Sequence, residues 1–166
     1  MWQPEVLQRF ARHHETREPI PEDLVQRLVA ARDLNIGLST MRQIYLGRFD
    51  LLLHGSSEPI DIEQANREAY ALTGFPFYEG THFGASFGHL MGGYDAGYYG
   101  YLWSKVYGDD MFSVFANEGV LSPEVGRRYR DEVLAMGHSR DAIDHLRAFL
   151  GREPSTDAFL SNLGLT

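Results

Sequence analysis

Tyrosines crowd one glycine-rich stretch of the chain, residues 87–112, which reads FGHLMGGYDAGYYGYLWSKVYGDDMF. Tyr94, Tyr98 and Tyr101 are spaced by four and then three residues, so on a helix their side chains would share one face. With His89 upstream, the three phenols would form a row of neutral hydrogen-bond donors. Such donors suit a developing oxyanion or the carbonyl group of a peptide. The stretch is therefore a candidate site for peptide chemistry.

The same spacing also has a purely structural explanation. Tyrosines at helical intervals usually pack in a core or an interface, where each hydroxyl bonds to a nearby group. Gly92 and Gly93 would allow close backbone approach and motion, but glycine also serves close helix packing. Spacing alone therefore leaves both explanations open.

The elements that would position these residues are helices, because apolar residues recur at helical spacing along most of the chain. We predict helices at about 5–14, 21–55, 61–72, 96–117, from 123 onward, at 139–150 and, briefly, after residue 155. The pattern over 21–55 is one long helix or two with a joint near residues 35–37. Asp61 with Gln64, Ser122 and Ser139 are the predicted capping residues.

Glycines interrupt the helical pattern in the middle of the chain, at about residues 74–100. Such a run predicts a loop with short extended pieces. No internal repeat and no long linker divides the sequence. We therefore predict a single all-α domain over residues 1–166, a multi-helix fold with a long Gly-rich loop.

Composition and charge exclude several classes of function. The 166 residues include 15 basic and 23 acidic side chains, for a net charge of -8, and Lys105 is the only lysine. This balance argues against binding to nucleic acid or to an anionic membrane. No run of about 18 apolar residues could span a membrane. The absence of cysteine excludes disulfides and cysteine nucleophiles and fits a cytoplasmic protein, so peptides remain as partners.

The tyrosine stretch resembles the signature of the thimet oligopeptidase and neurolysin family of zinc metallopeptidases, which also includes oligopeptidase A and dipeptidyl carboxypeptidase. Residues 2–14 resemble the helix that follows the family's third zinc ligand, residues 35–44 its helix before the loop, and residues 149–160 its C-terminal end. The resemblance covers essentially the whole chain. It implies the C-terminal half of a zincin-like catalytic domain.

The resemblance also implies roles for particular residues, because the family's enzymes cut short peptides inside a deep channel. Tyr101 matches a tyrosine proposed to hydrogen-bond the oxyanion of the tetrahedral intermediate, and His89 lies with it at the implied reaction centre. The implied substrate-binding residues are His89, Tyr94, Tyr98, Tyr101, Gly92 and Gly93. The loop that carries them matches a flexible element that closes over the bound peptide.

The family's zinc site, a His-Glu-x-x-His helix with a downstream glutamate, has no counterpart in this sequence. The resemblance begins just after the third ligand, so it assigns no zinc ligand and no general base to this chain. His13, His14 and Glu15 form the one dense cluster, but neighbouring helical side chains point about 100° apart, so we expect a solvated helix end. His138 and His145 are expected at the surface. We expect no metal in this chain and little or no peptidase activity from it alone.

Three hypotheses remain open at this point. The chain is part of a truncated or split metallo-oligopeptidase whose zinc comes from an N-terminal partner chain, or it is a non-catalytic peptide-binding or self-assembling module, or it is a fragment with no role of its own. Without the rest of the enzyme it would expose an apolar, aromatic face. We therefore expect a homo-oligomer, most simply a two-fold homodimer.

Overall fold

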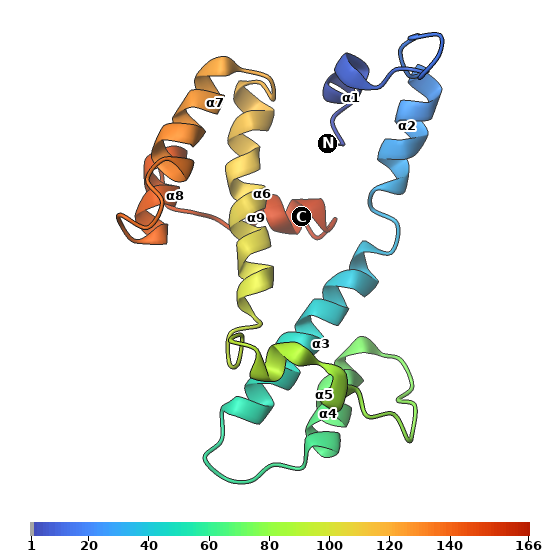
Figure 1. Cartoon of the computed structure of the whole chain (residues 1–166), viewed down its shortest axis with the longest axis vertical. Coiled ribbons are helices and arrows are strands. Elements are labelled where there is room, and N and C mark those ends of the chain that lie inside the picture. The colour runs from blue at the N-terminus through green and yellow to red at the C-terminus, as the bar shows by residue number, and fades with distance from the viewer. Residues whose placement is uncertain (1) are drawn as a thin grey trace. The chain divides into compact units, whose positions relative to one another are not determined.

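Helices and turns make up the computed structural model over residues 2–166, the part of the chain that the structure describes (Figure 1). Within these residues, extended pairing is limited to an isolated bridge between Arg12 and Pro19. The all-α prediction is confirmed. The chain divides into two compact units, which we call the terminal unit (1–34 with 106–166) and the central unit (35–105). The single domain over 1–166 stays a prediction.

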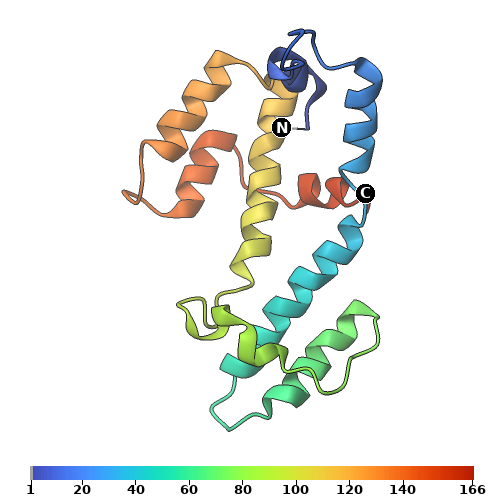
Figure 2. The ribbon, with the colours of Figure 1, turned by 45° about the vertical axis from the view of Figure 1, so that its right-hand side comes forward.

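The terminal unit is built on the longer part of α6. Its elements are α1 (Pro4–Phe10), α2 (Glu22–Ala31), most of α6 (Gly100–Glu118), α7 (Pro123–Tyr129), the π-helical turn η3 (Arg130–Leu134), α8 (Ala142–Leu150) and α9 (Asp157–Asn162). Figure 2 shows α7 and α8 beside α6. The rings of Phe115 in α6 and Phe149 in α8 pack with centroids 5.7 Å apart. Phe149 is fully buried, and burial of a side chain of this size stabilises a fold by about 1.5–3 kcal/mol.

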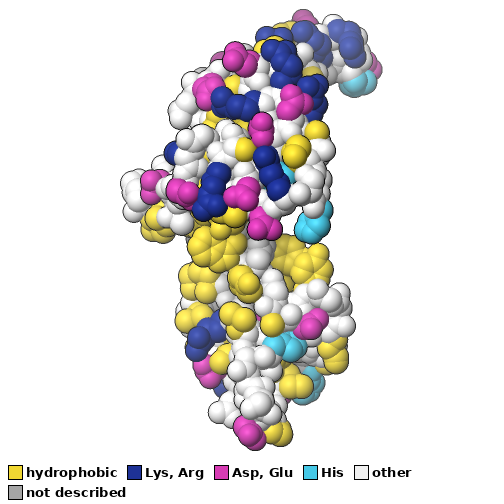
Figure 3. Space-filling view, turned by 90° about the vertical axis from the view of Figure 1, so that its left-hand side faces the viewer, with side chains coloured by type: hydrophobic (Ala, Val, Ile, Leu, Met, Phe, Trp, Pro, Cys, Tyr) yellow, Lys and Arg dark blue, Asp and Glu magenta, His cyan; other side chains and the backbone are white. Residues whose placement is uncertain are grey.

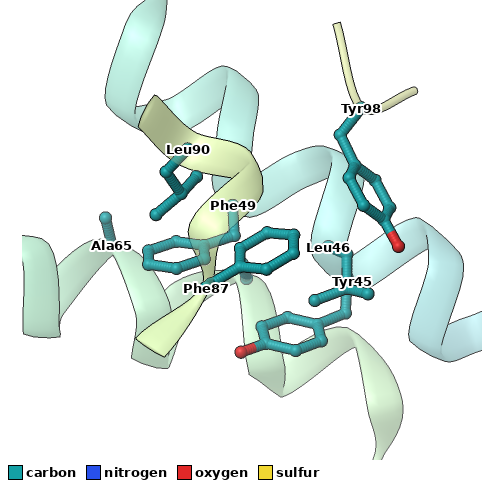
Figure 4. Packing of buried hydrophobic residues seen from close by; sticks show 8 residues of the cluster. Tyr45, Leu46, Phe49, Ala65, Phe87, Leu90 and Tyr98 are labelled. Atoms are coloured by element: carbon teal, nitrogen blue, oxygen red, sulfur yellow. The ribbon is translucent and has the colours of Figure 1, made fainter. Parts of the chain in front are cut away.

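The central unit packs a long helix against short ones. Its elements are α3 (Ile36–His54), α4 (Ile62–Tyr70), the 3₁₀ turns η1 (Ala71–Thr73) and η2 (Gly88–Met91), α5 (Phe83–Ser86) and the first residues of α6. The buried cluster consists of Tyr45, Leu46, Phe49, Ala65, Ala69, Phe87, Leu90 and Tyr98 (Figure 4). Two candidate site features, Tyr98 and the segment that begins at Phe87, are thus anchored in this core.

Three helix boundaries agree with the sequence predictions. The Oδ1 atom of Asp61 accepts hydrogen bonds from the amides of Glu63 (2.9 Å) and Gln64 (3.0 Å) at the start of α4. The Ser122 hydroxyl accepts an amide hydrogen bond at the start of α7. Asn35 has a φ of 60°, a left-handed conformation that cannot continue a right-handed helix. The pattern over 21–55 is therefore two helices, α2 and α3.

The Gly-rich segment departs from its prediction. The extended pieces expected within residues 74–100 are short helical turns instead, α5 and η2. The helix expected from Ala96 begins at Gly100, because Ala96 has a φ of 57° and is excluded from a right-handed helix. Tyr94 and Tyr98 are consequently presented by turns that are held against helices, and of the three candidate tyrosines Tyr101 lies within α6.

Helix α8 also differs from its prediction. Asp141, rather than Ser139, precedes its first residue, and the Asp141 side chain makes no capping hydrogen bond. His145, expected at the surface, is buried. It lies four residues before the buried Phe149, and side chains four apart share one helix face, so His145 points inward.

The surface carries many large apolar side chains, as Figure 3 shows for one face. Within residues 2–166, each helix is too short or too polar to span a lipid bilayer. Exposed apolar and aromatic residues of the central unit include Leu38, Ile44, Leu51, Ile62, Phe75, Met91, Tyr99 and Trp103. Apolar exposure on this scale is typical of a surface that another protein segment covers.

Candidate substrate-binding site

The structure brings together the four aromatic residues that the sequence singled out. The His89 ring lies 5.6 Å from Tyr94, 5.2 Å from Tyr98 and 5.8 Å from Tyr101, measured between ring centroids. The rings of Tyr94 and Tyr101 stack at 5.3 Å, and those of Tyr98 and Tyr101 lie 4.9 Å apart. We call these four residues the aromatic cluster. It joins η2, the turn after it and the first turn of α6.

The three tyrosines of the cluster are not equally accessible. Tyr98 is 7% exposed, and its hydroxyl donates to Oε1 of Gln43 at 3.2 Å. Tyr94 and Tyr101 are 48% and 41% exposed. The phenols of Tyr94 and Tyr101 can therefore reach a ligand, while Tyr98 is largely buried because it belongs to both the core and the cluster.

The environment of Tyr101 keeps its hydroxyl protonated. A side-chain hydrogen bond with Tyr94 is the largest cause that raises the pKa of Tyr101, followed by desolvation and by the charges that Tyr94 and Tyr98 would carry if ionised. A phenol with a raised pKa remains a hydrogen-bond donor at neutral and mildly alkaline pH. A donor of this kind stabilises negative charge that develops on an oxygen atom.

Gly92 and Gly93 form the turn that returns the chain from η2 to Tyr94. A Cβ atom at Gly92 would lie 2.8 Å from the carbonyl oxygen of Gly88, closer than real Cβ atoms approach. Gly93 has a φ of 88°, a conformation that residues with side chains rarely adopt. The turn geometry therefore requires glycine at both positions. Their predicted contact with a peptide stays a prediction.

A buried carboxylate fixes the turn before α6. Asp50 in α3 is 1% exposed. Its Oδ1 atom accepts the amide hydrogen of Ala96 and its Oδ2 atom that of Tyr98, both at 3.0 Å. Nδ1 of His54 lies 2.8 Å from Oδ1 and 3.0 Å from the Asp50 carbonyl oxygen. Because both neighbours are acceptors, we assign the proton to Nδ1.

Asp50 was missed by the sequence reasoning. The available signal was an acidic residue directly after Phe49, in the buried face of an otherwise apolar helix segment. A buried carboxylate needs several hydrogen-bond donors. Its position alone therefore predicts that backbone amides donate hydrogen bonds to it or that cations pair with it. The two amides that bind Asp50 lie 46 and 48 residues further along the sequence. No local sequence pattern identifies them.

An open pocket adjoins the aromatic cluster. Its volume is about 620 Å³, and it is lined by Arg42, Gln43, Leu46, Phe83, Ser86, Phe87, Gly88, His89, Gly92, Tyr94 and Tyr98. A volume of this size lies within the usual range for small-ligand sites, about 300–1,000 Å³. The pocket thus places three members of the cluster beside a space that can hold part of a peptide.

The described residues do not fit a zinc ion. Residues 2–166 contain no group of three His, Asp or Glu side chains placed to hold a metal. In the dense cluster near the N-terminus, Nδ1 of His13 accepts the amides of Glu15 and Thr16, and Nε2 of His14 lies 3.4 Å from the Glu15 carboxylate. His13 thus forms a local turn contact.

Comparison with known proteins gives a consistent result along the chain. The model of a family described as "Peptidase family M3" matches residues 1–165. The chain is 38% identical over 170 residues to the Thimet-like oligopeptidase of Dictyostelium discoideum, 37% over 171 residues to Oligopeptidase A of Escherichia coli (strain K12) and 38% over 172 residues to Saccharolysin of Saccharomyces cerevisiae. Each match covers 99% of this chain and about a quarter of the relative's length.

Proposed function

This chain belongs to peptidase family M3, and we propose that it forms the substrate-binding and oxyanion-stabilising wall of a zinc metallo-oligopeptidase that cleaves short peptides. The family consists of zinc-dependent peptidases, which supports a role in peptide hydrolysis. The chain spans about a quarter of the length of its relatives, so the activity of a complete enzyme is part of the proposal.

The observation that carries the proposal is the aromatic cluster with two accessible phenols. The Tyr101 hydroxyl donates a hydrogen bond to the oxyanion that forms when a peptide carbonyl is attacked. Tyr94 and His89 contact the peptide near that carbonyl. Tyr98 lines the neighbouring pocket and belongs to the proposed peptide-binding surface. Asp50 does not reach the peptide but holds the turn, so that the donors are already positioned before a peptide binds. Preorganisation of this kind is what makes a hydrogen-bond donor effective in catalysis.

We propose that this chain supplies hydrogen-bond donors and that the general base, like the metal site, lies outside it; residues 2–166 contain no group placed to hold a metal. The zinc ion and the water it activates would come from a zinc-bearing N-terminal partner segment or chain. We accordingly propose that the isolated chain is inactive and that its substrates are short peptides. A cytoplasmic location, expected from the absence of cysteine, is a further part of the proposal.

The test uses a short peptide and a phosphinic analogue of it, whose tetrahedral, anionic centre stands for the intermediate. Analogues of this kind bind more tightly than substrates where a site favours the transition state. We expect Tyr101→Phe to weaken binding of the analogue by about three- to tenfold, since a hydrogen bond to a charged group is lost. Binding of the plain peptide should change less. Affinities are measured by fluorescence anisotropy with the full chain.

Tyr99→Phe is the matched control, because Tyr99 is exposed, lies in the same segment and is not a member of the aromatic cluster. It should bind the analogue as the unmodified chain does. Equal affinity of Tyr101→Phe and the unmodified chain for the analogue would refute the oxyanion role. Chelator-sensitive cleavage of a quenched-fluorescent peptide by the isolated chain would refute the proposed inactivity.

A second candidate function is a non-catalytic peptide-binding or self-assembling module. The exposed apolar residues of the central unit favour it, because such a surface is stabilised by a partner. The partner would be a second copy of the chain in a homodimer, or the zinc-bearing segment of a complete enzyme. If the partner is a second copy of the chain, the aromatic cluster would bind a peptide without cleaving it, or would only pack against neighbouring side chains.

A further inference from the structure

The pocket beside the aromatic cluster has one permanently charged side chain, Arg42, and no acidic residue in its lining. Its other polar side chains come from Gln43, Ser86, His89, Tyr94 and Tyr98. We infer that this pocket is a carboxylate-binding subsite in which Arg42 recognises a carboxylate of the bound peptide. The inference rests on the proposed peptide-binding function and adds a specificity to it.

Arg42 is free to meet an anionic ligand. Its guanidinium carbon lies 5.8 Å from the centroid of the Phe83 ring, and a cation over a ring face is held in place without losing its charge. Within residues 2–166 no carboxylate lies at ion-pair distance from Arg42. Arg48, six residues further along α3, differs because it pairs with Glu68 at 2.7 Å. The guanidinium donors of Arg42 thus remain available.

Neighbouring groups add to the donor character of the pocket. Oε1 of Gln43 accepts the Tyr98 hydroxyl, which assigns the acceptor end of this amide and leaves its NH₂ group as a donor. The Tyr94 hydroxyl is also accessible. A planar guanidinium with additional N–H and O–H donors matches the two oxygen atoms of a carboxylate.

A carboxylate of a peptide fits better than a larger anion. The chain has a net charge of -8 and a single arginine here, so a polyanion such as nucleic acid would be repelled. A short peptide carries a carboxylate at its C-terminus, and Asp or Glu side chains carry the same group. Because the pocket shares His89, Tyr94 and Tyr98 with the aromatic cluster, a peptide that reaches the cluster can place a terminal residue at Arg42. The subsite would therefore favour short peptides that end near the cluster.

The test compares three peptides that share one sequence up to the last residue, measured by fluorescence anisotropy on the full chain. The first has a free C-terminus, the second an amidated C-terminus, and the third an amidated C-terminus with Glu as its last residue. We expect amidation to weaken binding by about three- to tenfold, the usual effect of a partly exposed charged hydrogen bond. If a side chain can substitute for the terminal carboxylate, the third peptide regains that affinity. If it does not, the C-terminal carboxylate is the ligand.

Arg42→Gln should abolish the difference between the free and the amidated peptide. Arg48→Gln is the matched control, since it removes the same charge from the same helix at a residue that is already paired, and it should keep the difference. Equal binding of the free and amidated peptides by the unmodified chain would overturn the subsite. So would an equal loss in both variants, because that would indicate a general charge effect.

A small probe separates failure of the subsite from failure of the proposed function. N-acetylglycine and its amide are titrated into the chain, and NMR shifts of the Gln43 side-chain amide are followed. One outcome is that N-acetylglycine but not its amide shifts the Gln43 signal, that Arg42→Gln removes this shift, and that no peptide binds. This result would support the subsite and overturn the peptide-binding function. Peptide binding without any dependence on a carboxylate would keep the function and overturn the subsite. Absence of both would overturn both.

Discussion

Replacement of Asp50 by asparagine tests whether a buried carboxylate holds the tyrosine turn in place. The substitution keeps the size of the side chain but leaves one oxygen where there were two. Asp50 uses its two oxygens separately, Oδ1 for the Ala96 amide and Oδ2 for the Tyr98 amide. An asparagine can accept from only one of them, and its NH₂ group would face the other N–H donor.

The magnitude follows from these contacts. Loss of one charge-assisted hydrogen bond costs about 1.5–3 kcal/mol, and the bonds that remain, including that from Nδ1 of His54, become ordinary ones. We therefore expect Asp50→Asn to lower the free energy of unfolding by about 2–4 kcal/mol. The effect should be local as well, so that the amide hydrogens of Ala96 and Tyr98 exchange faster with solvent. Urea unfolding and NMR-detected hydrogen exchange measure the two effects.

Asp61→Asn is a matched control within the same unit. Asp61 also accepts two backbone amides, but both bond to its Oδ1 atom. An asparagine oxygen can keep both, and Asn caps helices about as well as Asp, so we expect a change below about 0.5 kcal/mol. If Asp50→Asn is as mild as Asp61→Asn, or if the Ala96 and Tyr98 amides stay protected, the reasoning about a two-oxygen anchor is wrong.

Two further predictions concern stability and assembly. Burial raises the pKa of Asp110, but hydrogen bonds from Arg152 and the Ser155 amide and the charge of Arg152 outweigh it, so the pKa lies below its ordinary value. The stabilisation is therefore present above the unfolded-state pKa of about 4 and is lost as pH falls through the folded-state pKa. The free energy of unfolding, measured as a function of pH, should fall over this acid range. Asp110→Asn should make that fall smaller. Light scattering at micromolar concentration should show a dimer or larger species, and a monomer would contradict the self-association expected from the exposed apolar residues.

Local chemistry was sufficient to predict much of the fold. Asp61 and Ser122 carry side-chain oxygens that satisfy the free amides of a helix start, and both act as predicted. Asn35 tolerates the left-handed conformation better than most residues, which explains why the chain breaks between α2 and α3. Tyr94, Tyr98 and Tyr101 were predicted to gather on one side, and their rings are in contact.

Long-range contacts explain where the predictions failed. The apolar pattern favours a helix from Ala96, but Asp50 takes the amide hydrogens of Ala96 and Tyr98 and fixes a turn, so α6 begins only at Gly100. Likewise, His145 is buried because its helix face packs inward, where its Nδ1 atom lies 2.9 Å from the carbonyl oxygen of Glu132. Both outcomes depend on partners outside the local segment, 46 and 48 residues away for Asp50 and 13 for His145, which propensity does not include.

One face of α3 serves as the template for the candidate site. Gln43, Gly47 and Asp50 are spaced by four and three residues, so they share a helix face. Asp50 binds the backbone amide of Tyr98, and Gln43 binds the hydroxyl at the other end of the same residue. Between them, Gly47 faces the Tyr99 backbone, where a Cβ atom would lie 3.5 Å from the Tyr99 Cα atom, an ordinary van der Waals contact. Tyr98 is therefore held at both ends. The ring of Tyr101 packs on that of Tyr98 and the ring of Tyr94 stacks on that of Tyr101, so the position of both accessible phenols depends on the oxygen atoms of Asp50 and Gln43.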